Sequence, residues 1–284
     1  MDLPREVIRD IVERALAEDV GRGDLTTLAL IPSSAQAEAR VVMREAGVVA
    51  GLPVLAAVFE AVDPALLVTP QATDGDHMAA GAVVAIVRGS ARSILTGERV
   101  ALNVLQRMCG IATLTARYVA AVGELPTRVL DTRKTTPGLR ALEKYAVRAG
   151  GGVNHRFGLY DAILIKDNHL ALLEAHGVDV GEVVRRAKAA VGPLVQVEVE
   201  ADTIEQAQQA AAAGADLILL DNMAPDMLRA AVAAIGGRAR LEASGGITLE
   251  TIRAVAETGV DYISVGALTH SARALDISLE VNGV

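Results

Sequence analysis

The sequence has very few aromatic residues and almost no cysteine. Aromatic residues make up 2% of its 284 residues and tryptophan is absent, so the stacking platforms that bind single-stranded nucleic acid are missing. One cysteine, Cys109, can form neither an intramolecular disulfide nor a zinc site built from several thiolates. We expect Cys109 to be a small buried residue, in a core of Ala, Val, Leu and Ile.

A long apolar run and an excess of basic residues are missing as well. The mean hydropathy is +0.35, yet Gly and charged residues interrupt every apolar run before the ~18 residues that a membrane-spanning helix needs. The net charge is −8, which argues against a nucleic-acid-binding surface. The first twenty residues lack the continuous apolar stretch of a signal peptide. We therefore expect a soluble cytoplasmic protein with neither nucleic acid nor membrane as a partner.

The common motifs for nucleotide hydrolysis, dinucleotide binding, zinc proteolysis and serine esterase chemistry are also absent. The charge that is present is unevenly distributed. Residues 128–169 carry eight basic and four acidic side chains, a net charge of +4, and such a centre can concentrate a small polyanion. Arg140, Lys144 and Arg148 recur every four residues, which favours instead a solvated helix face for these three.

The first 122 residues predict a unit that mixes helices and strands. The long helical pattern at its end is expected to break at Gly110, and the junction between two domains is expected within it. Helices are predicted over 4–19, 53–62 and 90–122, and strands over 38–49 (broken at 45–47), 66–69 and 83–88.

After Pro126, short apolar strands alternate with Ala-rich helices. Strict alternation predicts a parallel sheet with right-handed crossovers. Because the units are too few to close a full barrel, we expect an incomplete or modified α/β barrel. The predicted strands are 128–130, 162–165, 194–199, 217–220, 240–243 and 262–265.

Polar residues follow nearly every one of these strands. In α/β barrels the functional groups lie at the carboxyl ends of the strands, so these residues are the candidates for binding and catalysis. They are Asp131 to Thr136, Lys166 to His169, Glu198 with Glu200, Asp221 with Asn222, Ser244 to Gly246, and Gly266 with Ala267.

The glycine-rich turns after the last two strands predict a phosphate site. Turns of this kind expose backbone N–H groups, and a helix expected to begin at Thr248 would add its positive end. The alternative is that Gly245 and Gly246 only form a tight turn. His270 lies close to these loops in the sequence, whereas His77, His169 and His176 are interpreted as structural.

Cationic residues after the first two strands predict binding of carboxylates. Arg133 and Lys134 are consecutive, and His155 and Arg156 follow a run of three glycines; arginine binds carboxylates in a bidentate manner. Ordinary surface charge is the alternative for any single pair. Lys166 ends a strongly apolar strand, so it needs an anionic partner or a site that suppresses its charge.

Carboxylates after the next strands could bind sugar hydroxyls or a metal ion. Glu198 and Glu200 are two residues apart on a strand and therefore face the same side, and Asp221 ends the following strand. Such oxygen ligands suit ribose hydroxyls or a Mg²⁺ ion that accompanies a pyrophosphate. The alternative is that the glutamates form ion pairs with Lys134 or Lys166.

Several strings together resemble the quinolinate phosphoribosyltransferase family. They are LDTRKTTPGLRALEKYAVRAGGGVNHRFGLYDAILIKDNHL at 130–170, GERVALNVLQRMCGIAT before it, LLDNM, EASGGI and YISVGALTHS after it, and EDVGRGDLTT at 18–27. The resemblance implies an enzyme of de novo NAD biosynthesis. Quinolinate and phosphoribosyl pyrophosphate would give nicotinate mononucleotide, pyrophosphate and CO₂, with Mg²⁺ and no organic cofactor.

The resemblance also implies the architecture and the assembly. An N-terminal α/β sandwich domain over 1–112, to which the segment 271–284 returns, would precede an incomplete TIM-like α/β barrel over 113–270. Family members form homodimers with shared active sites, in which one N-terminal domain covers the barrel mouth of the partner. The choice between a dimer and a hexamer stays open.

Site residues follow from the family pattern. The quinolinate carboxylates would meet Arg133, His155, Arg156 and Arg99 of the partner subunit. Lys134 and Lys166 would neutralise phosphates and carboxylate, and Glu198 and Asp221 would meet the ribose hydroxyls and the metal, directly or through the substrate; these four are the predicted catalytic residues. Glu200 is the alternative to Glu198. The 5′-phosphate would be held by Ser244, Gly245, Gly246, Gly266 and Ala267, with Thr132, Val265 and His270 also contacting substrate.

Three other functions stay open. Lys166 could form a Schiff base in an aldolase on the same kind of barrel. A related phosphoribosyltransferase-like enzyme could act on a different aromatic acid. A barrel without catalytic activity could serve as a ligand-binding sensor.

Overall fold

The computed structural model describes residues 3–283 and divides into two compact units. Unit 1 comprises the chain up to Ala116 together with Lys134–Gly151 and the segment from Ala267 onward, and unit 2 comprises Arg117–Arg133 and Gly152–Gly266. Met1, Asp2 and Val284, the ends of the predicted N-terminal domain and returning segment, lie outside the described residues.

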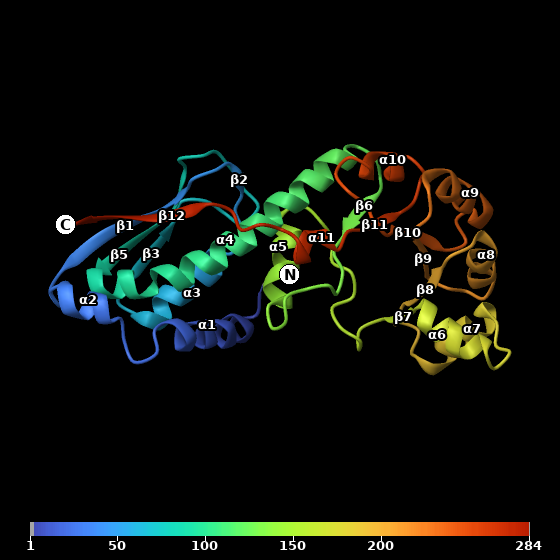
Figure 1. Ribbon diagram of the computed structural model, residues 1–284, viewed down its shortest axis with the longest axis horizontal. Coiled ribbons are helices and arrows are strands. Elements are labelled where there is room, and N and C mark those ends of the chain that lie inside the picture. The colour runs from blue at the N-terminus through green and yellow to red at the C-terminus, as the bar shows by residue number, and fades with distance from the viewer. Residues whose placement is uncertain (1–2, 284) are drawn as a thin grey trace. The chain divides into compact units, whose positions relative to one another are not determined.

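Unit 1 is built on an antiparallel sheet that includes the C-terminal strand. Its strand order is β12-β1-β5-β3, with β1 Gln36–Met43, β3 Leu67–Pro70, β5 Val83–Ser90 and β12 Ile277–Gly283. The C-terminal strand β12 pairs with β1 from Ala37 to Met43, as the red and blue strands side by side in Figure 1 show. A short ladder joins β2 Gly47–Val48 to β4 His77–Met78.

The helices of unit 1 pack their apolar residues into one core. Leu55 and Phe59 of helix α3 and Met43 of β1 are essentially inaccessible to solvent. Cys109 is also fully buried, which confirms the prediction of a small buried residue. Burial raises the pKa of its thiol to about 12. The helices are α1 Arg5–Asp19, α2 Leu25–Leu30, α3 Leu52–Val62, the part of α4 Ala91–Val122 up to Ala116, α5 Arg140–Ala149 and α11 Ala267–His270.

The long helix α4 runs unbroken through Gly110, so the predicted break there is wrong. A Cβ atom at this position would lie 2.0 Å from the backbone oxygen of Arg273. Glycine is therefore needed for the close approach of two backbones and not for a bend. The division between the two units falls within α4, after Ala116.

Unit 2 is a parallel α/β sheet, and all the predicted strands are confirmed. Within the described residues the strand order is β6-β11-β10-β9-β8-β7, which leaves β6 and β7 as unjoined edges. This open arrangement is the predicted incomplete barrel. The strands are β6 Arg128–Leu130, β7 Ile163–Ile165, β8 Val197–Ala201, β9 Leu217–Asp221, β10 Arg240–Ser244 and β11 Tyr262–Ser264.

The helices of unit 2 begin and end at residues that suit those positions. The hydroxyl of Thr203 accepts a hydrogen bond from Gln206 N, whose side chain bonds back to the Thr203 backbone in a capping box. Pro225 begins α9, which ends at Gly236 in the left-handed conformation. The helices, besides the end of α4, are α6 Asp167–Glu174, α7 Val180–Ala190, α8 Ile204–Ala212, α9 Pro225–Ile235 and α10 Ile252–Ala256.

Three local predictions are wrong. Helix α10 begins at Ile252 rather than Thr248 and is only five residues long, so it lends no helix end to the turn at Gly246. Helix α6, which begins directly after Lys166, was not predicted. Lys144, expected on a solvated face, is only 2% exposed, because α5 turns that face inward. No helix in the described part of the chain is long and apolar enough to span a membrane.

Candidate active site

In unit 2 the predicted residues collect at the carboxyl ends of neighbouring strands. Asp221 ends β9 and Ser244 ends β10, where the two residues are register partners. Gly266 follows β11, which pairs with β10 on one side and with β6 on the other. The fold therefore brings the loops of four strands to one edge of the sheet, as the alternating pattern predicted.

A buried aspartate positions His155 and its neighbours beside β6. Asp131, fully buried, accepts hydrogen bonds from the backbone N–H of His155 (2.8 Å) and from the side-chain amide of Asn154 (2.7 Å). Arg156 donates from its Nη1 to the carbonyl of Ala162 (3.0 Å). Hydrogen bonds to the buried Asp131 and to the backbone of Ala162 thus hold residues 154–156 in place.

Two guanidinium groups lie close together in this region. Burial lowers the pKa of Arg156, and the positive charge of Arg133 lowers it further, while Glu198 and Asp161 offset part of the effect. The Nε atom of Arg156 is buried and has no hydrogen-bond partner among the described residues. A buried guanidinium of this kind is suited to bind an anion.

His155 lies against two buried glutamates. Its Nε2 atom is 3.0 Å from a carboxylate oxygen of Glu198 and 3.6 Å from one of Glu242. Its Nδ1 atom accepts the backbone N–H of Arg156 at 2.7 Å, so the hydrogen-bond pattern assigns a proton to Nε2. Glu242 on β10 was not among the predicted residues; the only signal was its place two residues before Ser244 in the EASGG string.

Glu242 is fully buried and is the most perturbed carboxyl of this region. Burial raises its pKa to about 8, with a further rise caused by the charge of Glu198, whereas His155, Ser264 and Lys166 lower it. Neither of its oxygens has a hydrogen-bond partner of normal geometry among the described residues, nor has Oε1 of Glu198. Two carboxyls that share a buried site cannot both ionise cheaply.

The two glutamates of β8 contact different side chains. Glu198 meets His155, whereas Glu200, two residues nearer the carboxyl end of the strand, binds Nζ of Lys166 at 3.0 Å. Lys166 thus has the anionic partner that the sequence predicted, and its side chain stays 48% exposed. This arrangement leaves Glu200 and Lys166 nearer the strand ends than Glu198.

The turn after β10 packs against the turn after β9. Asn222, in the left-handed conformation at φ 53°, donates its backbone N–H to Ser244 O and its side-chain amide to Asp221. At Gly245 (φ 98°) a Cβ atom would lie 2.1 Å from Oδ1 of Asn222, whereas at Gly246 it would meet nothing within 4 Å. Asn222 is thus a further residue of this edge that only the structure shows to shape the loop.

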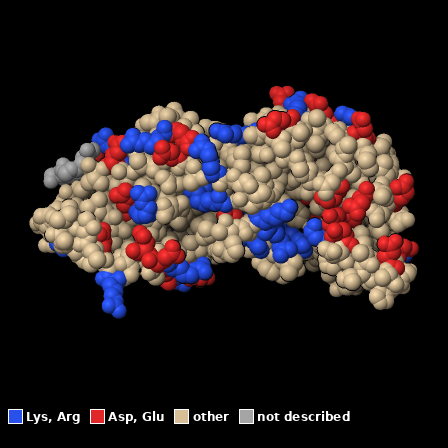
Figure 2. Space-filling view, in the orientation of Figure 1, with Lys and Arg blue, Asp and Glu red and all other residues tan. Residues whose placement is uncertain are grey.

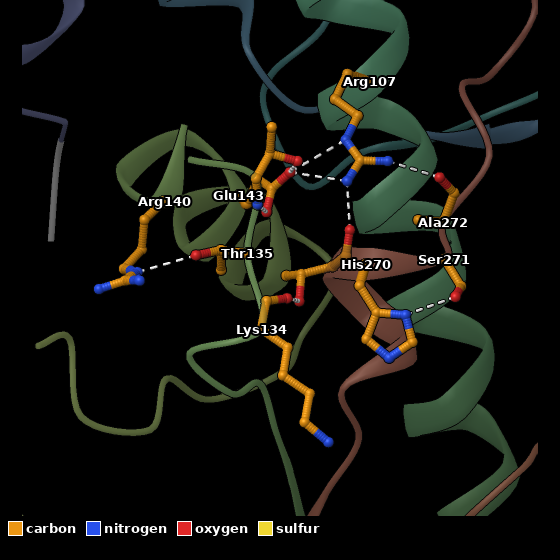
Figure 3. Close-up of polar contacts among 10 residues, drawn as sticks. Arg107, Lys134, Thr135, Arg140, Glu143, His270, Ser271 and Ala272 are labelled. Carbon is orange, nitrogen blue, oxygen red and sulfur yellow. Dashed lines mark hydrogen bonds and ion pairs between the residues drawn. The ribbon is translucent and has the colours of Figure 1, made fainter. Parts of the chain in front are cut away.

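The remaining predicted residues lie in unit 1. Lys134 is exposed, and its backbone oxygen accepts the hydroxyl hydrogen of Thr269 on α11 (2.8 Å). His270, whose Nδ1 is 2.6 Å from Ser271 Oγ, extends on the same side of α11 as the Lys134 side chain in Figure 3. Arg99 is exposed on α4.

Figure 3 also shows what holds the segment after Lys134. Glu143 of α5, 1% exposed, accepts hydrogen bonds from Arg107 of α4 (2.8 Å from Nη2) and from the Thr136 backbone (3.1 Å) and hydroxyl (2.8 Å). Arg107 in turn donates to the carbonyl of Ala272 at 2.7 Å and to that of Thr269. One buried carboxylate therefore ties residues 134–136 and α11 to the long helix.

The charge of unit 2 is mixed rather than uniformly basic. On the face shown in Figure 2, Asp and Glu side chains gather over the region of β8, β9 and β10. The carboxylates there can accept hydrogen bonds from substrate hydroxyls. The cations on the segments around β6 and β7 can bind anionic groups of the same substrate. Thr132, half-buried, is the second residue after β6, and Val265, buried, directly follows β11.

Comparisons with known proteins agree on one family. The models described as quinolinate phosphoribosyl transferase, N-terminal domain and C-terminal domain, match residues 24–109 and 111–280. The chain is 45% identical over 274 residues to the probable nicotinate-nucleotide pyrophosphorylase (carboxylating) of Bacillus subtilis, covering 96% of this chain and 93% of that protein.

Solved structures show the same fold. NadC from Streptococcus pyogenes is 44% identical with a TM-score of 0.95, covering 100% of this chain and 99% of that one. The nicotinate-nucleotide pyrophosphorylase from Francisella tularensis is 38% identical with a TM-score of 0.92, covering 99% and 98%.

Proposed function

Because the chain belongs to the quinolinate phosphoribosyltransferase family, we propose that it transfers the phosphoribosyl group of phosphoribosyl pyrophosphate to quinolinate. The products are nicotinate mononucleotide, pyrophosphate and CO₂, a step of NAD biosynthesis. Some of its relatives are named for the carboxylating direction, as nicotinate-nucleotide pyrophosphorylases, and others for the decarboxylating direction, as quinolinate phosphoribosyltransferases.

The observation that carries this proposal is the pair of arginines beside β6. Arg133 and Arg156 are close enough to repel each other, and Nε of Arg156 is buried without a hydrogen-bond partner among the described residues. An anion of two carboxylates relieves the repulsion and satisfies the buried donor. Quinolinate, a pyridine with two adjacent carboxylates, has that chemistry.

The reaction requires no nucleophile from the protein. The quinolinate nitrogen attacks the anomeric carbon as the bond to pyrophosphate breaks, through a state in which the ribose carries positive charge; nearby carboxylates such as Glu200 and Asp221 stabilise this charge. The ring nitrogen becomes cationic. Its positive charge then stabilises the electron pair that stays on the adjacent ring carbon when the carboxylate of that carbon departs as CO₂. A proton then adds to this carbon.

We assign the anionic groups of phosphoribosyl pyrophosphate to the loops after β10 and β11 and to Lys134 and Lys166. The turn at Ser244, Gly245 and Gly246 supports this because a Cβ atom at Gly246 would meet nothing within 4 Å, which leaves space beside the turn for a phosphate. Gly266, Ala267 and His270 stay predicted contacts of the 5′-phosphate, as does Arg99 for the carboxylates in the partner's site.

Mg²⁺ is part of the proposal. Asp221 is only partly buried at the end of β9 and offers the hard carboxylate oxygens that Mg²⁺ prefers. Glu198 fits less well, because it is 4% exposed and its Oε2 contacts His155. A Mg²⁺ ion held at Asp221 would supply neutralising charge to the departing pyrophosphate.

The decisive experiment combines purified protein with quinolinate, phosphoribosyl pyrophosphate and Mg²⁺ and follows nicotinate mononucleotide and CO₂ by mass spectrometry. Arg156→Ala is expected to raise KM for quinolinate by about 30-fold or more, because truncating one partner of a buried charge pair costs about 2–5 kcal/mol. Arg240→Ala is the matched control: Arg240 begins β10, at the opposite edge of the same sheet, and donates to Tyr262. Absence of product from the native protein, or equal effects of the two variants, would contradict the assignment.

The other candidates are less well supported. A Schiff-base lysine needs a desolvated amine, whereas Lys166 is half-exposed and paired with Glu200. A different aromatic acid as substrate would reveal itself in the same assay when nicotinate and other pyridine acids replace quinolinate. A sensor would bind both substrates without turnover.

We further propose a cytoplasmic homodimer with shared active sites. Leu159 and Tyr160, in the loop after Arg156, are 72% and 81% exposed, a surface suited to contact with another subunit. Mixing inactive Arg99→Ala and Arg156→Ala proteins tests this: random exchange between dimers restores about a quarter of the native activity if each site uses both subunits. No recovery, with exchange verified, would oppose shared sites, and sedimentation would distinguish dimer from hexamer.

A further inference from the structure

The cluster of His155, Glu198 and Glu242 contains more buried carboxyl groups than the proposed reaction uses. Glu242 and Glu198 are 0% and 4% exposed, and their facing oxygens and the histidine nitrogen all lie within 4.8 Å of one another. Three of the four glutamate oxygens have no hydrogen-bond partner of normal geometry among the described residues. Unpaired buried polar groups are costly, so their presence calls for a reason.

The contacts of His155 indicate what this cluster does. One ring nitrogen accepts the backbone N–H of Arg156, and the other points at the two glutamates. The ring therefore links the interior of the sheet to the backbone of a residue proposed to bind substrate. The orientation of the His155 ring is fixed only if its Nε2 atom also has a partner.

A metal ion is the alternative occupant of such a group. One histidine nitrogen and two carboxylates within 4.8 Å could bind a transition metal. Arg156 is close enough for Glu198 to raise its pKa, and Arg133 acts on the same group, so cations already face this cluster. A further dication in the same buried space would be repelled.

We propose that Glu242 is a positioning residue: with Glu198 it holds Nε2 of His155 inside the sheet, and through the ring it fixes the backbone of Arg156 for binding of a dicarboxylate. This inference rests on the proposed function. Glu242 contacts no substrate and acts through His155.

The test compares Glu242→Leu, Glu242→Gln and Ile235→Ala. Glu242→Leu keeps the volume and removes both oxygens, and Glu242→Gln restores hydrogen bonding without a carboxyl. Ile235, buried at 1% exposure on α9 of the same unit, is the control for stability, because its truncation leaves only a cavity. Steady-state kinetics with each substrate, thermal unfolding and metal analysis of the purified proteins are the measurements.

We expect Glu242→Leu to raise KM for quinolinate about 10- to 100-fold, the effect of losing a group that orients a ligand-binding residue. KM for phosphoribosyl pyrophosphate should stay within about twofold, and Glu242→Gln should recover most of the loss. Ile235→Ala should lower the melting temperature and leave both KM values unchanged.

Other outcomes would overturn the proposal. Equal KM changes for both substrates, or a quinolinate KM that follows the melting temperature in all variants, would show a structural role only. A transition metal bound at one equivalent and lost in Glu242→Gln would show a metal site. If Glu242→Leu does not fold, Glu242→Ala takes its place, and a quinolinate KM of Glu242→Ala at the native value would refute positioning. Failure of the native protein to use quinolinate would instead refute the proposed function.

Discussion

Removing the carboxylate of Glu143 should destabilise the protein more than its single charge suggests. Glu143 is 1% exposed and accepts hydrogen bonds from Arg107 and from both the backbone and the hydroxyl of Thr136. Glu143→Ala leaves the positive charge of Arg107 without its carboxylate and leaves two donors of Thr136 unpaired.

The expected magnitude follows from these contacts. Breaking a buried ion pair costs about 3–5 kcal/mol. Arg107 keeps the carbonyls of Thr269 and Ala272 as acceptors, so we expect the lower end, about 3 kcal/mol. For a chain of this size that corresponds to a fall in melting temperature of about 5 °C.

The assay is thermal unfolding followed by circular dichroism, with Glu13→Ala as the control. Glu13 is paired with Arg9 at 3.8 Å, but both side chains are about two-thirds exposed, and such pairs contribute about 0–1 kcal/mol. A double variant that replaces Arg107 and Glu143 by leucine should recover part of the loss, because no buried charge remains. Equal melting temperatures for Glu143→Ala and Glu13→Ala would refute the reasoning.

Three further changes have defined outcomes. Gly245→Ala places Cβ against Asn222, so it should raise KM for phosphoribosyl pyrophosphate and lower the melting temperature, whereas Gly246→Ala should cost only the ~1–2 kcal/mol of a left-handed residue; equal effects would contradict this. Gly110→Ala should destabilise, although this substitution stabilises an ordinary helix by ~1 kcal/mol, and an unchanged melting temperature would contradict the close approach to Arg273. Burial raises the pKa of Glu242 to about 8 from the ordinary 4.5, so its contribution to stability is complete below pH 4.5 and is lost as the pH rises through 8. Glu242→Gln should therefore gain in melting temperature over the native protein between pH 6 and pH 9, and a constant difference would refute the raised pKa.

The elements of unit 2 could be predicted because their signal is local. Each strand is a short apolar run bounded by polar residues, and each helix has its own apolar period, so the observed strands lie within three residues of the predicted ends. Alternation then implies a parallel sheet, and its carboxyl edge follows. The anionic partner of Lys166 could likewise be predicted, because the residue directly follows an apolar strand.

The predictions that were wrong concern features that depend on tertiary contacts, which a local sequence pattern does not show. Gly110 was predicted to break a helix. Instead, the lack of a side chain there lets the helix approach the backbone of Arg273, which is more than 160 residues away in the sequence. Lys144 was placed on a solvated face because the period of charges does not show which face another segment covers. Helix α10 was expected four residues too early, since the turn at Thr248 and Thr251 closes on itself first.

The sequence by itself determined the family, the alternation of strands and helices, and the residue types that collect at the strand ends, because these depend on composition and short-range spacing. Only the tertiary structure decided between Glu198 and Glu200 as partners of His155 and Lys166. Only it revealed Glu242 and showed that Asn222 shapes the loop after β10. These assignments depend on which side chains of different strands meet in the interior. Alternation along a strand gives the shared face of Glu198 and Glu200, but the packing of neighbouring strands selects what each one meets.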